Sequence, residues 1–147
     1  MTVRHDKVSY PPYPRSVPLA RRRVASLVAD WGHPELAGDA ALVAGELCGN
    51  AVLHGCLRDR LFRVDVTLSG KDLRISVTDP RGERLPVPRK ADPDDQFGRG
   101  LLIVQALAAR WDVQTLTVGK AVWAELDVTA HTAGTAACTS PRACRAT

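Results

Sequence analysis

The chain has 147 residues, enough for one domain with its own core. Its hydrophobic fraction of 45% is ordinary for a globular protein, and no apolar run is long enough to span a membrane. The net charge of +4 comes mostly from arginines scattered among acidic residues, which does not indicate binding to nucleic acid. No hydrophobic segment marks a secretory signal near the N-terminus, so we expect a soluble, cytoplasmic protein without a membrane partner.

The four cysteines, at positions 48, 56, 138 and 144, include no CxxC pair and therefore lack the spacing of a zinc site. Cys48 falls within a predicted helix, where a free thiol behaves as a small apolar side chain. The cysteines at 138 and 144 lie in an Ala/Thr-rich stretch from 129 to 147. We interpret this stretch as a disordered tail and assign these two cysteines no role.

Residues 1–15 are rich in proline and basic residues, and they predict an edge strand or an extended arm. The next segment predicts a helix from Ser16, the expected N-cap, to about Trp31. Pro18 is acceptable in the first turn, and Gly32 ends the helix. The apolar stripe of this helix consists of Ala20, Val24, Leu27, Val28 and Trp31.

Arg21, Arg22 and Arg23 stand in the early turns of this helix. Three consecutive helical residues point in three directions, so they cannot form a single patch by themselves. Arg21 is expected to flank the apolar stripe, and the other two to face water. Two interpretations stay open for them: solubilising charges, or contacts with a protein partner.

A second helix is predicted from Pro34 to Gly55, with the proline in its first turn and the glycine as its C-cap. Its buried stripe consists of Leu36, Ala40, Val43 and Leu47. Glu46, Asn50 and His54 repeat every four positions and form one polar row beside that stripe. The row is either a solvated helix face or part of a site.

Two glycines, Gly45 and Gly49, lie inside the same helix. Each costs roughly 1 kcal/mol relative to alanine in a helix interior. Their presence favours a close approach of some other group to this helix.

Two strands follow, because apolar and polar residues alternate from Phe62 to Leu68 and again from Leu73 to Val77. A turn at residues 69–72 joins them into a hairpin with one buried face, and the second strand ends at Asp79. The segment 83–97 contains three prolines and many charges, so it predicts a long loop of the kind that often forms a lid.

Gly98-Arg99-Gly100 precedes a short helix whose inward residues would be Leu101, Val104, Leu107 and Ala108. The last two strands are predicted from Trp111 to Val118 and from Ala121 to Val128, with a turn at Gly119-Lys120. This order of elements predicts an α/β (α+β) fold within one domain, residues 1–128. We expect a two-layer sandwich whose mixed, mostly antiparallel sheet carries about three helices on one face.

Three features of this arrangement together indicate a nucleotide site. Free N–H groups at a glycine-containing helix N-terminus bind phosphates. The amide carbonyl of Asn50 can ligate Mg²⁺, which prefers oxygen ligands. The carboxylate of Asp79 can accept a hydrogen bond from an exocyclic amine, which suits adenine rather than guanine. Taken singly, each has a plainer explanation as a turn, a loop or a solvated helix face.

Four segments, in this order and spacing, resemble the GHKL (Bergerat-fold) ATPase superfamily. They are ELCGNAVLHG at 46–55, DPRG at 79–82, GRGLLIV at 98–104 and GKAVWAEL at 119–126. The closest branch is that of the small bacterial anti-sigma-factor serine/threonine kinases. The resemblance covers roughly residues 8 to 128.

The resemblance implies a site for ATP and Mg²⁺ between the central helix and the lid at 83–97. Asn50 matches the residue that holds Mg²⁺, and Asp79 matches the one that recognises the adenine amino group. Further nucleotide contacts would come from His54, Gly82, Gly98, Arg99, Gly100 and Leu101.

The resemblance also implies an activity and partners. Glu46 matches the proposed general base, which takes a proton from a serine hydroxyl on an anti-anti-sigma protein; a sigma factor is the alternative partner. The helix with Arg21, Arg22 and Arg23 helps to form the partner surface in such kinases, and two copies of the chain could also pair. Phosphoryl transfer needs positioning and a base, and Glu46 lies one turn from Asn50. A structural network with an N–H group or an arginine is the alternative for Glu46.

The chain departs from the family pattern in two places. Arg81 and Glu83 occupy the glycine positions of Asp-x-Gly-x-Gly, with Gly82 between them. Ala121 stands where a threonine hydroxyl normally helps to hold adenine, a loss on the order of 1 kcal/mol. The alternative function is therefore a catalytically weak or inactive module that acts by binding a partner. A histidine kinase is disfavoured, because no helical hairpin with a phosphorylatable histidine precedes the domain.

Overall fold

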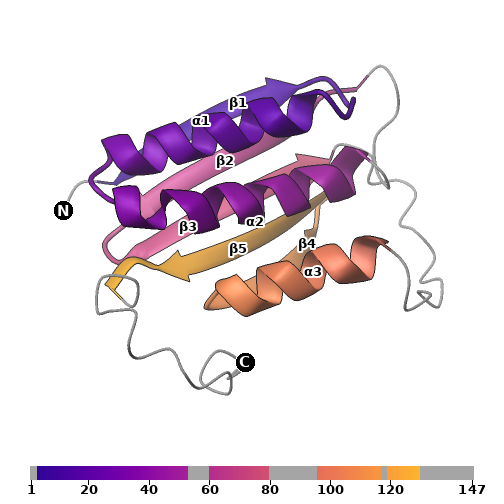
Figure 1. Ribbon diagram of the computed structural model, residues 1–147. Coiled ribbons are helices and arrows are strands. Elements are labelled where there is room, and N and C mark those ends of the chain that lie inside the picture. Colours follow the sequence, from indigo (N-terminus) through magenta and orange to yellow (C-terminus); the bar gives the residue numbers. More distant parts are fainter. Residues whose placement is uncertain (1–2, 53–59, 80–95, 117–118, 130–147) are drawn as a thin grey trace.

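The computed structural model describes residues 3–52, 60–79, 96–116 and 119–129. In chain order its elements are β1 (Arg4–Tyr10), α1 (Ser16–Asp30), the 3₁₀ turn η1 (Pro34–Leu36), α2 (Ala37–Asn50), β2 (Phe62–Ser69), β3 (Asp72–Asp79), α3 (Gln96–Leu107), β4 (Arg110–Thr115) and β5 (Lys120–Asp127). The strands form one sheet in the order β1-β2-β3-β5-β4. Figure 1 shows the three α-helices on one face of this sheet.

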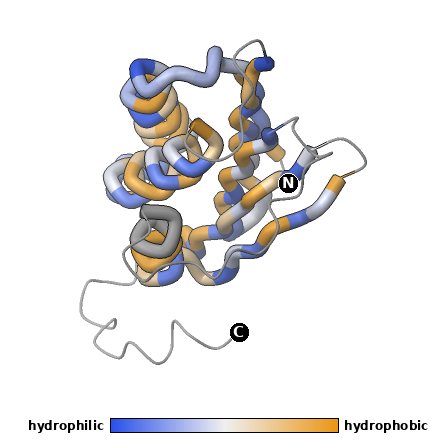
Figure 2. Tube along the Cα trace, turned by 90° about the vertical axis from the view of Figure 1, so that its right-hand side faces the viewer, coloured by the Kyte–Doolittle hydropathy of each residue, from blue (hydrophilic) through white to orange (hydrophobic). Residues whose placement is uncertain are grey.

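The predicted two-layer sandwich is confirmed. Figure 2 shows the helices in one layer and the sheet in the other. Every described strand pair is antiparallel, so the sheet is not mixed in the part of the chain that the structure describes. None of the described helices is long and apolar enough to cross a lipid bilayer.

The core lies between the two layers, and α2 is the middle helix, packed against both α1 and α3. The stripe predicted for α2 is fully buried, since Leu36, Ala40, Val43 and Leu47 are all at most 1% exposed. Alternate residues of the hairpin point at this stripe and are at most 3% exposed: Phe62, Val64, Val66, Leu73, Ile75 and Val77. Hydrophobic periodicity therefore identified both faces of the core correctly.

The predicted start of α1 was wrong by one residue. Ser16 is the first helical residue and Arg15 is the N-cap, without a capping side chain. The Ser16 hydroxyl donates instead to the carbonyl of Pro11 at 2.7 Å, and thereby satisfies a carbonyl of the proline-rich turn. The predicted end is confirmed, because Gly32 has a φ of +99°, which is unfavourable for residues with a side chain.

The central helix is less regular than its pattern predicted. Pro34 opens a 3₁₀ turn, and the α-helix proper begins only at Ala37. At its other end the helix passes from Asn50 into a wider π-type turn at Ala51 and Val52, a feature that often marks functional sites. Gly55, the predicted C-cap, lies outside the described residues.

The last third of the chain required two corrections. Helix α3 begins at Gln96, so residues 98–100 belong to its first turns rather than preceding it. Lys120 is not in a turn, because it is the first residue of β5 and pairs with both Asp79 and Thr115. The predicted lid, apart from its last two residues, and the tail beyond Thr129 lie outside the described residues.

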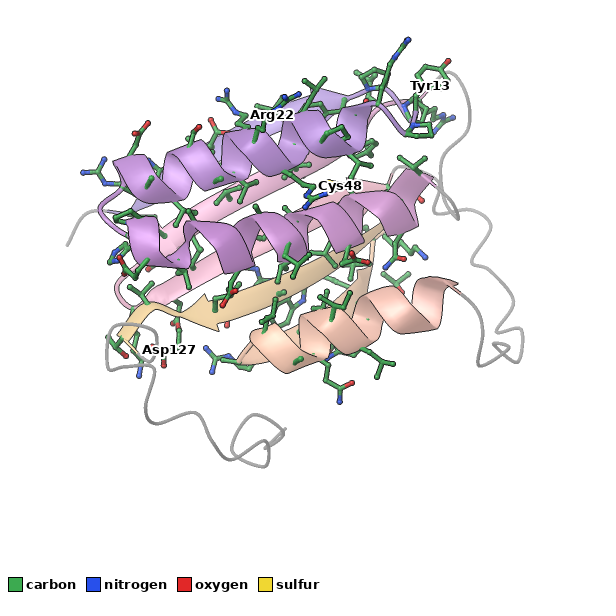
Figure 3. The ribbon with its side chains drawn as sticks, viewed as in Figure 1. Tyr13, Arg22, Cys48 and Asp127 are labelled. Carbon is green, nitrogen blue, oxygen red and sulfur yellow. The ribbon has the colours of Figure 1, made fainter. Side chains whose placement is uncertain are left out.

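Cys48 behaves as the apolar filler that the sequence predicted. Its side chain is fully buried, and Figure 3 shows it between α1 and α2. Burial raises the pKa of this thiol to about 12, because the thiolate would lose its hydration. Cys48 therefore stays protonated at neutral pH and is not a candidate nucleophile.

The three arginines of α1 point in three directions, as predicted. Arg23 does not face water alone, however, because it binds Asp6 of β1 through two hydrogen bonds of 2.7 and 2.9 Å. These bonds hold the pKa of Asp6 below its ordinary value. The side chain of Arg21 lies against α2 at Gly45. Arg22 lies on the outer surface of the helix layer (Figure 3). Arg22 is thus the arginine best placed to meet a partner.

The two glycines of α2 differ in their surroundings. A Cβ added at Gly45 would lie 2.8 Å from Cδ and 3.1 Å from Cγ of Arg21, so the predicted close approach is confirmed there. At Gly49 no atom of the described residues lies within 4 Å of such a Cβ, so these residues show no close approach there.

We expect Gly49→Ala to raise the free energy of unfolding by up to about 1 kcal/mol, since alanine restricts the unfolded chain and nothing opposes its methyl group. Gly45→Ala is the matched control: its gain in helix propensity is offset by the displacement of Arg21. Urea unfolding of both variants measures the difference. A destabilised Gly49→Ala protein would show that another group occupies the space beside Gly49.

Candidate functional site

Four chain segments meet at one end of the molecule. Figure 1 shows the end of α2, the end of β3, the start of β5 and the start of α3 at the same side of the sandwich. The antiparallel register explains part of this meeting, because Asp79 ends β3 directly opposite Lys120, which begins β5. The predicted site residues of α2 and β3 are therefore brought together by the fold.

A small pocket with room for about one water molecule lies at this end. Its lining residues are Leu47, Asn50, Ala51, Val77, Asp79, Lys120 and Val122. The walls are apolar, and three polar side chains converge on them.

Asn50 is buried in the pocket wall, with only 8% of its surface exposed. The helical stripe puts it there, since it follows Leu47 by three positions and ends α2. Its amide nitrogen Nδ2 is buried and has no hydrogen-bond partner among the described residues. A buried amide without a partner costs about 1–3 kcal/mol, and a bound ligand is one way to satisfy it.

Asp79 is more deeply buried than Asn50, with 3% exposure. It shares the core face of β3 with Val77, because side chains two residues apart lie on the same face of a strand. A buried carboxylate beside apolar walls can accept a hydrogen bond from an N–H donor of a bound base, and this role of Asp79 stays a prediction.

Lys120 is a pocket residue that the sequence analysis missed. It lines the pocket on the same face as Asp79, whereas Ala121 pairs with Thr78 on the opposite face of the sheet. The prediction that Ala121 removes a hydroxyl from the base pocket was therefore wrong by one position. The register in which β5 pairs with β3, set by the turn at Gly119, would have placed Lys120 in the pocket. Composition alone does not reveal this register.

Glu46 lies one turn before Asn50 and is half-buried. Residues four apart on a helix have Cβ atoms roughly 5–6 Å apart, so the two side chains share one row as predicted. The structure shows no hydrogen bond or ion pair between Glu46 and any described residue. The arginine network considered as an alternative for this carboxylate is not present in the described part of the chain.

The remaining predicted contacts belong to α3 or lie outside the described residues. The backbone at Gly98, Arg99 and Gly100 is helical near the start of α3, where the first four N–H groups of a helix have no intrahelical acceptor. Leu101 follows as a half-buried residue of the same helix. His54, Gly82, Arg81 and Glu83 lie outside the described residues.

The donor set is compatible with a nucleotide-borne Mg²⁺. No group of three or more His, Cys, Asp or Glu side chains that could hold a metal occurs among the described residues. Mg²⁺ in nucleotide sites needs only one or two protein ligands, because water and phosphate oxygens complete its shell. The amide oxygen of Asn50 can supply one such ligand, and its Nδ2 can donate to a phosphate oxygen.

The comparisons with known proteins point to one family. A family model described as the histidine kinase-like ATPase domain matches residues 10–126. Among solved structures, a histidine kinase domain from Erythrobacter litoralis EL346 blue-light activated histidine kinase matches with a TM-score of 0.48 and 24% identity. That match covers 80% of this chain and 63% of the other chain. No curated protein matches the sequence.

We expect Asn50→Leu to raise the free energy of unfolding of the ligand-free protein by about 1 kcal/mol, because it removes a buried amide without a partner. Asn50→Asp is the control of equal shape: it buries a second carboxylate in the pocket of Asp79 and should lower stability. Thermal unfolding without nucleotide compares the two. A Leu variant less stable than wild type would show that the Asn50 side chain is already satisfied.

Proposed function

We propose a function from the premise that this chain belongs to the histidine kinase-like ATPase family, whose model matches residues 10–126. The protein binds ATP and regulates a protein partner. Its finer role is that of a serine/threonine kinase of the anti-sigma-factor type, which phosphorylates an anti-anti-sigma protein. The observation that carries this proposal is the pocket in which Asn50 and Asp79 lie buried between apolar walls.

Different residues of the chain would bind the base, the Mg²⁺ ion and the phosphates. Apolar walls from α2, β3 and β5 enclose the base, and the Asp79 carboxylate accepts an N–H from it. Asn50 would hold Mg²⁺ through its amide oxygen. The N-terminal N–H groups of α3 donate to phosphate oxygens. Mg²⁺, when bound, supplies charge neutralisation on the phosphate oxygens.

Glu46 supplies the base. Its carboxylate accepts the proton of a serine hydroxyl as the serine oxygen bonds to the γ-phosphorus. The bond from that phosphorus to the β–γ bridging oxygen breaks, and ADP leaves. Glu46 lies one turn from Asn50 and is half-buried, so a hydroxyl from a partner can reach both it and the nucleotide.

The partner surface centres on Arg22. All three side chains are exposed, but Arg21 lies against Gly45 and Arg23 binds Asp6, whereas Arg22 makes no hydrogen bond or ion pair with another described residue. Leu19, three residues earlier on the same outer face, is 50% exposed. The first turn of α1 contains no acidic residue. An apolar contact beside a free cation suits an acidic surface on an anti-anti-sigma protein or a sigma factor.

A second function is favoured by the composition of the pocket. Lys120 places a charge where the base would bind, and the glycine positions after Asp79 hold Arg81 and Glu83. Under this alternative the protein binds its partner but transfers little phosphoryl group to it.

We expect Glu46→Gln to lower phosphoryl transfer by about 10²-fold or more, because general base catalysis contributes about 10²–10⁴. Nucleotide and partner binding should persist. The assay follows radiolabelled phosphate from ATP to anti-anti-sigma proteins of the same organism, and Glu35→Gln serves as a remote acid control. Arg22→Ala should weaken partner capture instead.

Undiminished transfer by Glu46→Gln would exclude Glu46 as the base. Partner capture by the wild-type protein with no transfer to any acceptor would favour the second function over the kinase.

A further inference from the structure

The outer face of α1 continues beyond Arg22 toward the turn that precedes the helix. Arg15, Leu19 and Arg22 follow one another at intervals of four and three residues, and Arg15 has helical backbone angles, so they share one side of the helix. Tyr13 adjoins this side, because the guanidinium carbon of Arg15 lies 5.3 Å from the centre of the Tyr13 ring. Figure 3 shows Tyr13 beside the start of α1 and Arg22 further along that helix. Together these four residues form the α1 outer face.

The side chains of the α1 outer face are accessible to a partner. Leu19 is 50% exposed, and Tyr13 is 38% exposed. Arg15 and Arg22 are also exposed, and neither makes a hydrogen bond or an ion pair with another described residue. Stacking on an aromatic ring positions a guanidinium group and leaves its N–H groups available as donors. An apolar side chain therefore lies between two cations, one of which an aromatic ring holds in place.

The charges around the α1 outer face favour an acidic partner. No aspartate or glutamate occurs in residues 7–29. Helix α1 has no acidic residue in its first turn and no capping side chain, and Arg15 occupies its N-cap. The N-terminal end of a helix macrodipole is positive, so a cation is unfavourable there. A carboxylate that pairs with Arg15 therefore removes an unfavourable interaction of the unbound protein.

The backbone N–H groups at this end of α1 are already engaged. The N–H of Ser16 donates to the carbonyl of Tyr13 at 2.9 Å. The N–H of Val17 donates to the carbonyl of Pro14 at 3.1 Å, and Pro18, the next residue, has no N–H. These hydrogen bonds also fix the turn that carries the Tyr13 ring, so binding costs little further ordering of that side chain. An acidic group must therefore be bound by the side chains of the α1 outer face.

We propose that the α1 outer face binds a partner helix that carries two carboxylates two turns apart and an apolar residue between them. Arg15 and Arg22 are seven residues apart, a rise of about 10 Å, and Leu19 lies between them. Each arginine pairs with one carboxylate, the Tyr13 hydroxyl donates to the carboxylate at Arg15, and Leu19 meets the apolar residue. The inference rests on the proposed function for the existence of a protein partner. It goes beyond that function by extending the contact to Tyr13 and Arg15 and by stating the chemistry that binds there.

The test uses purified anti-anti-sigma proteins of the same organism, each with a fluorescent label whose anisotropy reports binding to the full chain. Arg15→Glu should lower the affinity at least about tenfold, because it replaces a charge-assisted contact with a repulsive one. Its melting temperature should not fall, since an acidic residue is favourable at the start of a helix. Leu19→Ser should lower the affinity about tenfold through the loss of an apolar contact. Lys71→Glu, in the exposed β2–β3 turn, is the matched charge-reversal control and should leave the affinity unchanged.

Three outcomes would overturn the inference. Partner binding that Arg22→Ala weakens but Arg15→Glu and Leu19→Ser leave unchanged would confine the contact to Arg22, and the proposed function would stand. A loss of affinity in Arg15→Glu with a matching fall in its melting temperature would assign Arg15 to the fold. Failure of every anti-anti-sigma protein to bind the wild-type chain would remove the proposed partner, and the inference with it.

Discussion

The packing of α2 on β3 and β5 is the constraint from which the site follows. Leu47 of the helix and Val77 and Val122 of the strands are at most 6% exposed and form the apolar floor of the pocket. The same periodicities that bury them carry Asn50 three residues further along the helix and Asp79 two residues further along the strand. The fold thus buries two polar side chains at its own edge, and the Asn50 amide nitrogen has no hydrogen-bond partner among the described residues.

Periodicity predicted much of this arrangement. The apolar residues of α2 recur at helical spacing and those of β2 and β3 at strand spacing, so the two layers and the row of Glu46 and Asn50 could be inferred from the sequence. The errors arose where the pairing of strands far apart in the sequence determines which residues face the pocket. Successive residues of a strand lie on opposite faces of the sheet. A one-residue uncertainty in where β5 begins therefore led us to expect Ala121, rather than Lys120, in the pocket.

Contacts between segments far apart in the sequence could also not be predicted from the sequence pattern. Arg23 is exposed, as expected, but β1 also brings Asp6, 17 residues earlier, within 2.7 Å of it. Ser16 carries a typical capping side chain, yet its hydroxyl meets the carbonyl of Pro11. In both cases a local preference was overridden by a partner that only the folded chain supplies.

The three arginines of α1 show that consecutive residues can have different contacts. Arg21 covers α2 at Gly45, and Arg23 ties the helix to β1. All three side chains are exposed, and Arg22 makes no hydrogen bond or ion pair with another described residue, so we assign the proposed partner contact to it.

Calorimetric titration of the purified protein with ATP, with and without Mg²⁺ and with Asn50→Ala as control, tests the central claim most directly. We expect binding that depends on Mg²⁺ and disappears in the variant. Absence of binding at millimolar ATP, or binding that Asn50→Ala leaves unchanged, would contradict a nucleotide site built on Asn50.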